Sequence, residues 1–309
     1  MSIDLKELIK KPNPLTQGHR MCPGCGAPTA IRQALMAVDD PVVIVGATGC
    51  MEVSTTVYPY SAWRVPFMHV AFENAGAGIS GVQAAHKVLS RQGRAKEGIK
   101  FVAFGGDGGT YDIGLQSLSG ALERGHDFTY ICYNNQGYMN TGAQRSSATP
   151  LNASATTSPA GSVIPGKLQR AKDLTEIVAA HNIPYVAQTT LHDPMDLIKK
   201  VKRAVETPGP AFVNVLVPCV LFWKIDQGDQ MKICQLAADS RFWPVYEVAG
   251  GKYSLSYKPK KDVPLEDFLR AQGRYSHLFK KGRERMDLVA AAQADVDESW
   301  KKLLVKCAL

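Results

Sequence analysis

The sequence has no long apolar run and no dense block of basic residues. None of its apolar runs approaches the ~20 residues that a helix needs to cross a bilayer. The start of the chain, Met1–Lys6, lacks the apolar stretch of a signal peptide. The formal net charge is +8, but aromatic side chains do not interleave with basic ones. We therefore expect a soluble cytoplasmic protein that binds neither membrane nor nucleic acid.

Internal repeats are absent as well, and nothing in the sequence favours disulfide bonds. In a cytoplasmic protein thiols stay reduced, so we interpret the seven cysteines as metal ligands or core residues. With 45% hydrophobic residues, the chain of 309 residues is long enough to bury a large core.

Short β-branched runs alternate with helical patterns along most of the chain. Strands are expected at 41–47, 100–104, 128–133, 184–188 and 211–217. Helices are expected at 27–38, 76–92, 113–124, 172–180 and 194–206. This alternation predicts an α/β fold, with a parallel sheet that has helices on both faces.

The two ends of the chain differ from this pattern. Residues 1–21 contain helix breakers and are expected to form an extended arm. We predict that residues 1–250 form the α/β domain and that residues 251–309 form a C-terminal extension. The extension should end in a helix near 283–305, which either contacts a partner subunit or lies on the surface in solvent.

A glycine-rich turn follows the strand expected at 100–104. Gly106 and Gly108 allow backbone amides to approach phosphate oxygens, and Asp107 offers a carboxylate to Mg²⁺. One helix and one strand later the chain returns to the same edge of the sheet, where Asn135 and the carbonyl of Gly137 would complete the metal site. We predict a diphosphate–magnesium site here; the alternative is a plain turn.

Four cysteines follow loop ends near this predicted site. Cys22 and Cys25 share one tight loop, Cys50 follows the first strand, and Cys219 follows the last strand of the α/β pattern. Four thiolates can hold a [4Fe–4S] cluster, and they can also hold structural zinc. The pair Cys22 and Cys25 alone would also suit a redox disulfide.

Several segments resemble one family of enzymes. Gly106–Asn135 resembles the thiamine diphosphate motif. Tyr138–Ser146, Phe72–Gly78 and Phe242–Tyr246 are similar to the corresponding segments of pyruvate:ferredoxin oxidoreductase and the other 2-oxoacid:ferredoxin oxidoreductases. The likeness covers roughly residues 17–275. It implies the thiamine diphosphate-binding fold and a β subunit that binds the diphosphate end of the cofactor.

The resemblance also implies which residues hold each cofactor. The [4Fe–4S] ligands would be Cys22, Cys25, Cys50 and Cys219. The Mg²⁺ ligands would be Asp107, Asn135 and Gly137, and the thiamine diphosphate contacts would be Gly49, Gly106, Asp107, Gly108, Asn135, Gly137, Asn140 and Thr141, with Asn140 as the catalytic residue. Asn135 stands where some members have Thr, and Val220 follows Cys219 where members often have Pro.

The implied reaction is oxidative decarboxylation of a 2-oxoacid, with pyruvate as the first expectation. Electrons would pass to the cluster and on to ferredoxin, and coenzyme A would take the acyl group. An α subunit would supply the pyrimidine half of the site, and γ and δ subunits would carry further clusters. The alternatives are another substrate (oxalate, 2-oxoglutarate or a branched-chain oxoacid), a cluster-free thiamine decarboxylase or synthase, and a zinc-stapled binding module.

Overall fold

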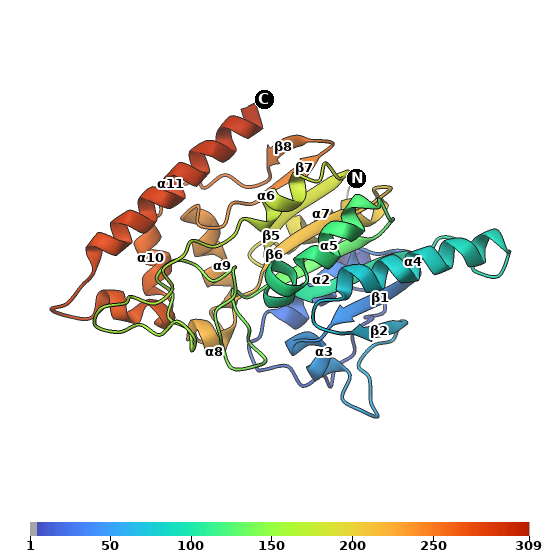
Figure 1. Cartoon of the computed structure of the whole chain (residues 1–309), viewed down its shortest axis with the longest axis horizontal. Coiled ribbons are helices and arrows are strands. Elements are labelled where there is room, and N and C mark those ends of the chain that lie inside the picture. The colour runs from blue at the N-terminus through green and yellow to red at the C-terminus, as the bar shows by residue number, and fades with distance from the viewer. Residues whose placement is uncertain (1–4, 309) are drawn as a thin grey trace.

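The computed structural model describes residues 5–308, and an eight-stranded sheet forms its framework (Figure 1). The strand order is β2-β1-β3-β4-β6-β5-β7-β8. The first six of these strands run parallel, and β7 and β8 are antiparallel to their neighbours. Their bounds are β1 Val42–Ala47, β2 Phe67–Val70, β3 Lys100–Gly106, β4 Thr129–Asn134, β5 Tyr185–Thr190, β6 Ala211–Leu216, β7 Tyr246–Ala249 and β8 Lys252–Leu255.

Helices cover both faces of the sheet. Successive side chains of a strand point to opposite faces, so both faces carry apolar side chains that the helices bury. Val102 and Phe104 of β3 belong to one buried cluster, while Phe101 and Ala103 belong to the other. The first cluster includes α2 (Ala27–Met36) and α7 (Pro194–Glu206), and the second includes α4 (Ala75–Arg91), α5 (Leu115–Glu123) and α6 (Leu174–Ala179). The predicted α/β fold, a parallel sheet with helices on both faces, is confirmed.

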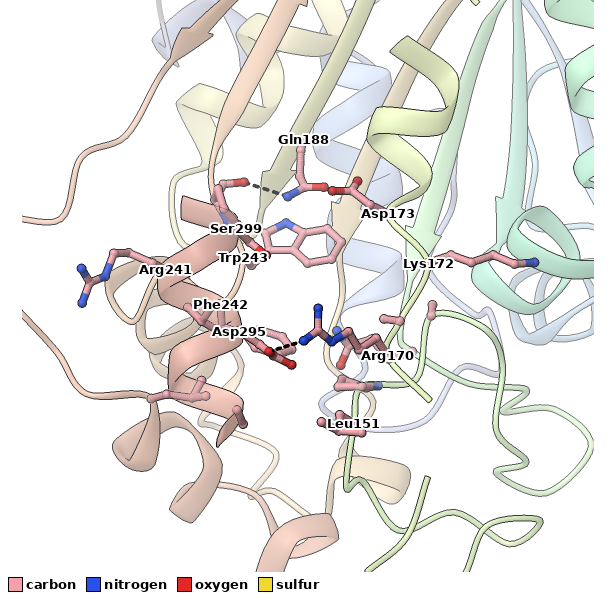
Figure 2. Close-up of a pocket in the computed structure, with 18 of the residues that line it drawn as sticks. Leu151, Arg170, Lys172, Asp173, Gln188, Arg241, Phe242, Trp243, Asp295 and Ser299 are labelled. Atoms are coloured by element: carbon pink, nitrogen blue, oxygen red, sulfur yellow. Dashed lines mark hydrogen bonds and ion pairs between the residues drawn. The ribbon is translucent and has the colours of Figure 1, made fainter. Parts of the chain in front are cut away.

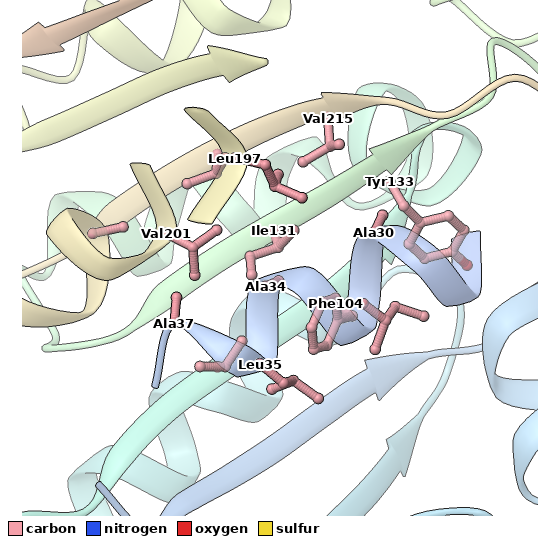
Figure 3. Close-up of a cluster of buried hydrophobic side chains, with 14 of the residues drawn as sticks. Ala30, Ala34, Leu35, Ala37, Phe104, Ile131, Tyr133, Leu197, Val201 and Val215 are labelled. Atoms are coloured by element: carbon pink, nitrogen blue, oxygen red, sulfur yellow. The ribbon is translucent and has the colours of Figure 1, made fainter. Parts of the chain in front are cut away.

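Helix α2 shows how small residues bring a helix close to the sheet. Its Ala30 and Ala34 are buried against the strands, together with Leu197 of α7 and Phe104 of β3 (Figure 3). Because alanine side chains are small, the helix backbone can approach the sheet closely, and the larger side chains of the strands fill the space between the two layers. The same helix begins directly after the Cys22–Cys25 loop, and its packing therefore fixes the position of that loop.

The sequence did not predict the short elements. They are α3 (Cys50–Thr55), α8 (Val220–Trp223), α9 (Gln230–Asp239), α10 (Leu265–Arg270), the π-helix η1 (Gly108–Ile113), the 3₁₀-helix η2 (Gly273–Phe279), and strands β2, β7 and β8. The expectation of an extended arm over residues 1–21 is wrong at α1 (Leu5–Leu8), which is one helical turn. Residues 1–4 of that expected arm lie outside the described residues.

The predicted C-terminal helix is α11 (Met286–Ala308), a long helix along one side of the molecule (Figure 1). It buries Val289 and Leu303 and packs near β8. Ion pairs from Lys306 to Glu176 and from Asp295 to Arg170 also join it to the body of the protein. The expected boundary after residue 250 falls in the turn between β7 and β8, so the division into 1–250 and 251–309 stays a prediction. Among the described residues, no helix is long and apolar enough to cross a membrane.

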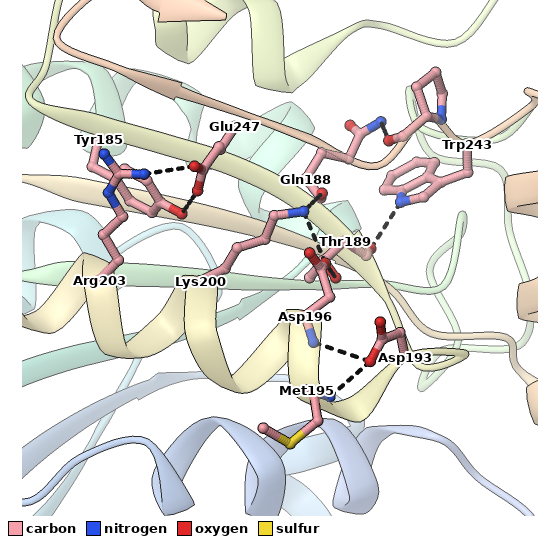
Figure 4. Close-up of polar contacts among 11 residues, drawn as sticks. Tyr185, Gln188, Thr189, Asp193, Met195, Asp196, Lys200, Arg203, Trp243 and Glu247 are labelled. Atoms are coloured by element: carbon pink, nitrogen blue, oxygen red, sulfur yellow. Dashed lines mark hydrogen bonds and ion pairs between the residues drawn. The ribbon is translucent and has the colours of Figure 1, made fainter. Parts of the chain in front are cut away.

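A buried lysine fastens α7 to β5 (Figure 4). Nζ of Lys200 donates to the Gln188 carbonyl oxygen at 2.9 Å and pairs with the Asp196 carboxylate at 2.8 Å. Asp196 also accepts a hydrogen bond from the Thr189 hydroxyl at 2.5 Å. The Lys200 side chain is only 2% exposed, so this pair is held in a water-poor environment.

We predict that Lys200→Ala lowers the free energy of unfolding by about 3 kcal/mol, because it leaves the Asp196 carboxylate without its cation. Urea unfolding of the purified chain measures the change. Lys199→Ala is the matched control: Lys199 is the exposed neighbour on the same helix, and its loss should matter by less than ~0.5 kcal/mol. Equal effects of the two substitutions would contradict the structural role of Lys200.

Candidate functional site

The predicted site residues follow the carboxyl ends of adjacent parallel strands. Gly49 comes after β1, Asp107 after β3, Asn135 after β4 and Cys219 after β6. These strands lie side by side in the order β1-β3-β4-β6, so their ends share one edge of the sheet. Ligands of open parallel sheets bind at this edge.

The Asp107 carboxyl group is completely buried at this edge. Its Oδ1 accepts a hydrogen bond from the Asn135 backbone N–H at 3.1 Å, and its Oδ2 accepts one from the Ser146 hydroxyl at 2.5 Å. Burial raises the pKa of Asp107 to about 7, although these hydrogen bonds oppose the shift. No lysine or arginine forms an ion pair with Asp107 in the described part of the chain, so these hydrogen bonds compensate its charge only in part.

Asn135 lies between Asp107 and Gly137. One terminal atom of its side-chain amide is 2.9 Å from Asp107 Oδ1 and 2.9 Å from the Gly137 carbonyl oxygen. With the amide nitrogen in that place, it donates to both oxygens. With the amide oxygen there, three oxygens lie next to one another, and oxygens are the ligands that Mg²⁺ prefers. The residues present therefore fit a magnesium ion.

The backbone of Asn135 is fixed on both sides. Its N–H donates to Asp107, and its carbonyl oxygen accepts a hydrogen bond from the indole Nε1 of Trp223 at 2.9 Å. Trp223 is fully buried at the end of α8. These two contacts fix the position of the Asn135 backbone next to Asp107.

Glycine is required at several positions of the site because a side chain there would collide with a neighbouring tyrosine. A Cβ on Gly108 would lie 2.6 Å from the Tyr138 ring, and one on Gly49 would lie 2.9 Å from the Tyr133 hydroxyl. A Cβ on Gly106 would lie 3.2 Å from the same hydroxyl. Larger residues would push these tyrosines away from the strand ends. The predicted contacts of Gly49, Gly106 and Gly108 with a cofactor stay predictions.

Asn140 and Thr141 are exposed at the tip of a turn. The turn is closed by backbone hydrogen bonds between Tyr138 and Gln144, at 2.9 and 3.2 Å. The Thr141 hydroxyl donates to the side chain of Gln144 at 2.6 Å. Both residues are therefore placed to meet a ligand or a partner from outside, and their predicted roles, including the catalytic role of Asn140, stay predictions.

Residues 136–168 form the long segment that carries this turn, and hydrogen bonds of its own buried side chains fix its conformation. Lys167 is 1% exposed, and its Nζ donates to the carbonyl oxygens of Thr149 at 2.6 Å and of Arg170 at 3.2 Å. The Thr149 hydroxyl donates to the Gln136 carbonyl oxygen at 2.6 Å. The segment can therefore place Ser146 against Asp107 without regular secondary structure of its own.

The four predicted cluster ligands gather in one region but do not form a metal cage. Each is a free thiol, and the charge of Cys219 helps to raise the pKa of Cys25 and of Cys50. Burial is the main cause, and the two pKa values reach about 11 and about 12. Within residues 5–308 no group of three or more His, Cys, Asp or Glu side chains is spaced to hold a metal ion. The role of Cys22, Cys25, Cys50 and Cys219 as ligands therefore stays a prediction.

The remaining cysteines lie elsewhere. Cys132 and Cys234 are fully buried in the two clusters that flank the sheet, and Cys307 is half-buried on α11. Cys132 and Cys234 are core residues in this structure.

A cavity of about 370 Å³ lies behind the site, beneath α11 (Figure 2). Its lining includes Tyr111, Asn134 and Gln136 near the strand ends, and Trp243 and Leu303 farther out. Asp107, Asn135 and the four cysteines do not line it. The cavity is therefore a separate feature, although it adjoins the residues that support the site.

Sequence reasoning missed three residues that organise the site. Ser146 and Trp223 bond directly to Asp107 and Asn135. The Tyr111 hydroxyl accepts hydrogen bonds from the side-chain amides of Asn134 and Asn214, each at 2.8 Å. Trp223 stands one helical turn after Cys219, a spacing visible in the sequence, but the contacts of Tyr111 join distant segments and leave no local signal.

Comparison with known proteins identifies the group to which this chain is similar. It matches the family described as thiamine pyrophosphate enzyme, C-terminal TPP binding domain, over residues 47–215. Thiamine pyrophosphate is another name for thiamine diphosphate, and the match spans Asp107, Asn135 and Gly137.

Two relatives are named pyruvate synthase subunit PorB. The protein of Thermotoga maritima is 48% identical, and the match covers 98% of this chain and 96% of the relative. That of Methanocaldococcus jannaschii is also 48% identical, over 93% and 95%. The ketoisovalerate oxidoreductase subunit VorB of Pyrococcus abyssi is 40% identical, over 93% and 91%.

A solved structure has the same fold. It is the 2-oxoglutarate:ferredoxin oxidoreductase from Magnetococcus marinus, with a TM-score of 0.55, 22% identity, and coverage of 72% of this chain and 79% of that one. The fold, the family match and the sequence similarity over nearly the full length of the chain all indicate the same family. The chain belongs to the 2-oxoacid:ferredoxin oxidoreductase family of thiamine diphosphate-dependent enzymes, as a β subunit.

Proposed function

We propose that this chain is the catalytic β subunit of a pyruvate:ferredoxin oxidoreductase and holds thiamine diphosphate through Mg²⁺. The observation that carries the proposal is the clustering of Asp107, Asn135 and Gly137 at the strand ends, where one terminal atom of the Asn135 amide lies 2.9 Å from both Asp107 Oδ1 and the Gly137 carbonyl oxygen. When bound, thiamine diphosphate supplies the carbon nucleophile that decarboxylation of a 2-oxoacid requires. The chain itself holds and orients the diphosphate end.

Each site residue has a defined part in this proposal. Asp107, the Asn135 amide oxygen and the Gly137 carbonyl bind Mg²⁺, which binds the diphosphate in turn. Gly49, Gly106 and Gly108 let the backbone approach the phosphates. Asn140 and Thr141, exposed at the tip of their turn, would contact the cofactor, and an α subunit would supply the pyrimidine half of the site.

The four gathered thiols are proposed to bind one [4Fe–4S] cluster. After burial, the charges of Cys22 and Cys219 help to raise the pKa values of Cys25 and Cys50, so these thiols lie near one another, and none of the four is in a disulfide. These thiols are not spaced to hold one metal ion, but in a four-iron cluster each thiolate binds a different iron, so the ligands of a cluster stand farther apart.

Pyruvate is the proposed substrate because the relatives at 48% identity are named for pyruvate and the ketoisovalerate relative is 40% identical. The proposed partners are an α subunit, γ and δ subunits with further clusters, coenzyme A and ferredoxin, in the cytoplasm. Residues 251–309, with α11 along one side, are proposed to contact another subunit. Exposed apolar side chains on α11, among them Leu304 and Val305, favour that contact over bare solvent.

Asp107→Ala should remove thiamine diphosphate from the purified complex. Losing a hydrogen-bond partner of a metal ligand already costs up to ~100-fold in affinity, and losing the ligand itself should cost more. Thiamine diphosphate per complex is measured after gel filtration in the presence of Mg²⁺. Asp127→Ala, which changes an exposed aspartate, serves as the control. Full retention of the cofactor by Asp107→Ala would refute the assigned metal site.

Iron analysis tests the cluster. The full chain, purified without oxygen, should hold about four iron and four sulfide, and Cys22→Ser should lose most of both. Cys307→Ser, on α11, should keep them. The redox role of the four cysteines would be overturned by zinc in place of iron. It would also be overturned by a chain that is saturated with thiamine diphosphate but contains no iron.

A substrate panel tests the assignment of pyruvate. The whole complex, given coenzyme A and a viologen dye, should show a kcat/KM for pyruvate at least ~10-fold above those for 2-oxoglutarate and 2-oxoisovalerate, since pocket size discriminates at about this level. If kcat/KM were higher for either of the larger acids, that acid would become the proposed substrate, and the family assignment would not change.

A further inference from the structure

The cavity of about 370 Å³ beneath α11 exists because this helix is held mainly near its two ends (Figure 2). The residues of α11 that face the body are spaced three and four apart, so they share one side of the helix. Val289 and Leu303, toward the ends of this stripe, are buried in two different hydrophobic clusters. Between them, the short side chains of Ala292, Val296 and Ser299 line the cavity. The helix therefore leaves space along its middle.

Aromatic rings line the cavity from the body of the protein. Phe242 and Trp243, which precede β7, are among them. The indole Nε1 of Trp243 donates to the Thr189 carbonyl oxygen at 2.8 Å, and the ring of Phe242 packs against that of Phe268, with centres 4.6 Å apart. These contacts hold both rings in place. A preformed, largely apolar cavity of about 300 to 1,000 Å³ is typical of sites that bind small organic molecules.

Two tyrosine hydroxyl groups at the cavity have unused hydrogen-bonding capacity. Tyr275 lines the cavity, is 1% exposed, and its hydroxyl has no hydrogen-bond partner among residues 5–308. Tyr111 also lines it, and its hydroxyl accepts hydrogen bonds from Asn134 and Asn214 but donates none within the described part of the chain. A buried hydroxyl without an acceptor is unfavourable. These groups therefore favour a ligand that carries acceptor oxygens.

The charged side chains that line the cavity are mostly basic. Two of the cations pair with carboxylates of the lining, and the other three pair with carboxylates that do not line the cavity. The lining is therefore positive on balance, which favours an anionic ligand. The cations are Arg170, Lys172, Arg241, Lys302 and Lys306, and the carboxylates are Asp173, Glu176 and Asp295.

The ion pair between Arg170 and Asp295 joins the body of the protein to the middle of α11 (Figure 2). The Arg170 side chain is 69% exposed, and ion pairs as exposed as this one contribute little to stability. A carboxylate on a ligand can therefore take the place of Asp295 at Arg170 without disrupting the fold.

We propose that the cavity beneath α11 binds an amphipathic organic anion, with an apolar body against the aromatic rings and a carboxylate at Arg170. The apolar lining, the two tyrosine hydroxyl groups and the positive balance of charge each favour one part of such a molecule. The inference goes beyond the proposed function and does not depend on it. None of the residues proposed to hold thiamine diphosphate, Mg²⁺ or the cluster lines this cavity.

The test is a calorimetric titration of the full chain, and of the whole complex, with 1-naphthylacetate and with its uncharged amide, 1-naphthylacetamide. The acid should bind with a Kd of ~1 mM or tighter. The amide should bind about threefold more weakly, because it has the same shape but no charge to pair with Arg170.

Two substitutions at the ion pair should act in opposite directions. Arg170→Met keeps a long side chain but removes the charge, so it should weaken binding of the acid about threefold. Asp295→Asn removes the carboxylate that competes for Arg170, so it should tighten binding of the acid by about the same factor. Neither substitution should change the affinity for the amide, which separates an effect of charge from an effect of structure.

A substitution that fills the cavity tests where the acid binds. Ala292→Phe should abolish binding, because the ring would occupy the space beneath α11. Ala291→Phe is the matched control, since Ala291 is exposed on the same helix and does not line the cavity. It should leave binding unchanged. If Ala292→Phe fails to fold, Ser299→Phe, at another lining position of α11, takes its place.

Four outcomes overturn the inference, and all of them leave the proposed function intact. The first is no binding of the acid to the wild-type chain, and the second is equal affinity for acid and amide. The third is equal binding by the cavity-filling variant and its control, because the acid would then bind elsewhere. The fourth is binding to the full chain but not to the whole complex, because another subunit would then fill the cavity.

Discussion

The burial of one carboxyl group, that of Asp107, is the constraint on which the site depends. A carboxylate at zero exposure is unfavourable unless cations or donors compensate it. Here the Asn135 N–H and the Ser146 hydroxyl compensate it only in part, and burial still raises its pKa to about 7. The turn after β4, the segment that carries Ser146 and the helix that carries Trp223 are all arranged around it. The divalent cation that we propose would complete this arrangement with oxygen ligands.

Parallel pairing makes this convergence possible. Since β1, β3, β4 and β6 are neighbours that run in the same direction, whatever follows each strand arrives at a common edge. The carboxylate, the amide and Cys219 need no special loops to meet there. The family match over residues 47–215 covers β3 and β4 and the turns that follow them.

Much of the fold could be predicted from local pattern, since largely buried strands such as β1 contain runs of β-branched residues. Strand β2 could not, because it lies at the edge of the sheet and Met68 and His69 within it are exposed. In the site, Asp107 and Asn135 were visible as strand-end motifs. Tyr111 was not, because its contacts with Asn134 and Asn214 join segments that only the tertiary fold brings together.

One indole ring has consequences for how this protein can change over time. Trp223 bonds the carbonyl of Asn135, lies beneath Arg274, and shares a single helical turn with Cys219. A substitution of Trp223 disturbs all three contacts at once, so it can persist only if other substitutions compensate for each of them. Drift at this position should therefore be much slower than drift at Cys132 or Cys234, whose burial can be matched by other small side chains.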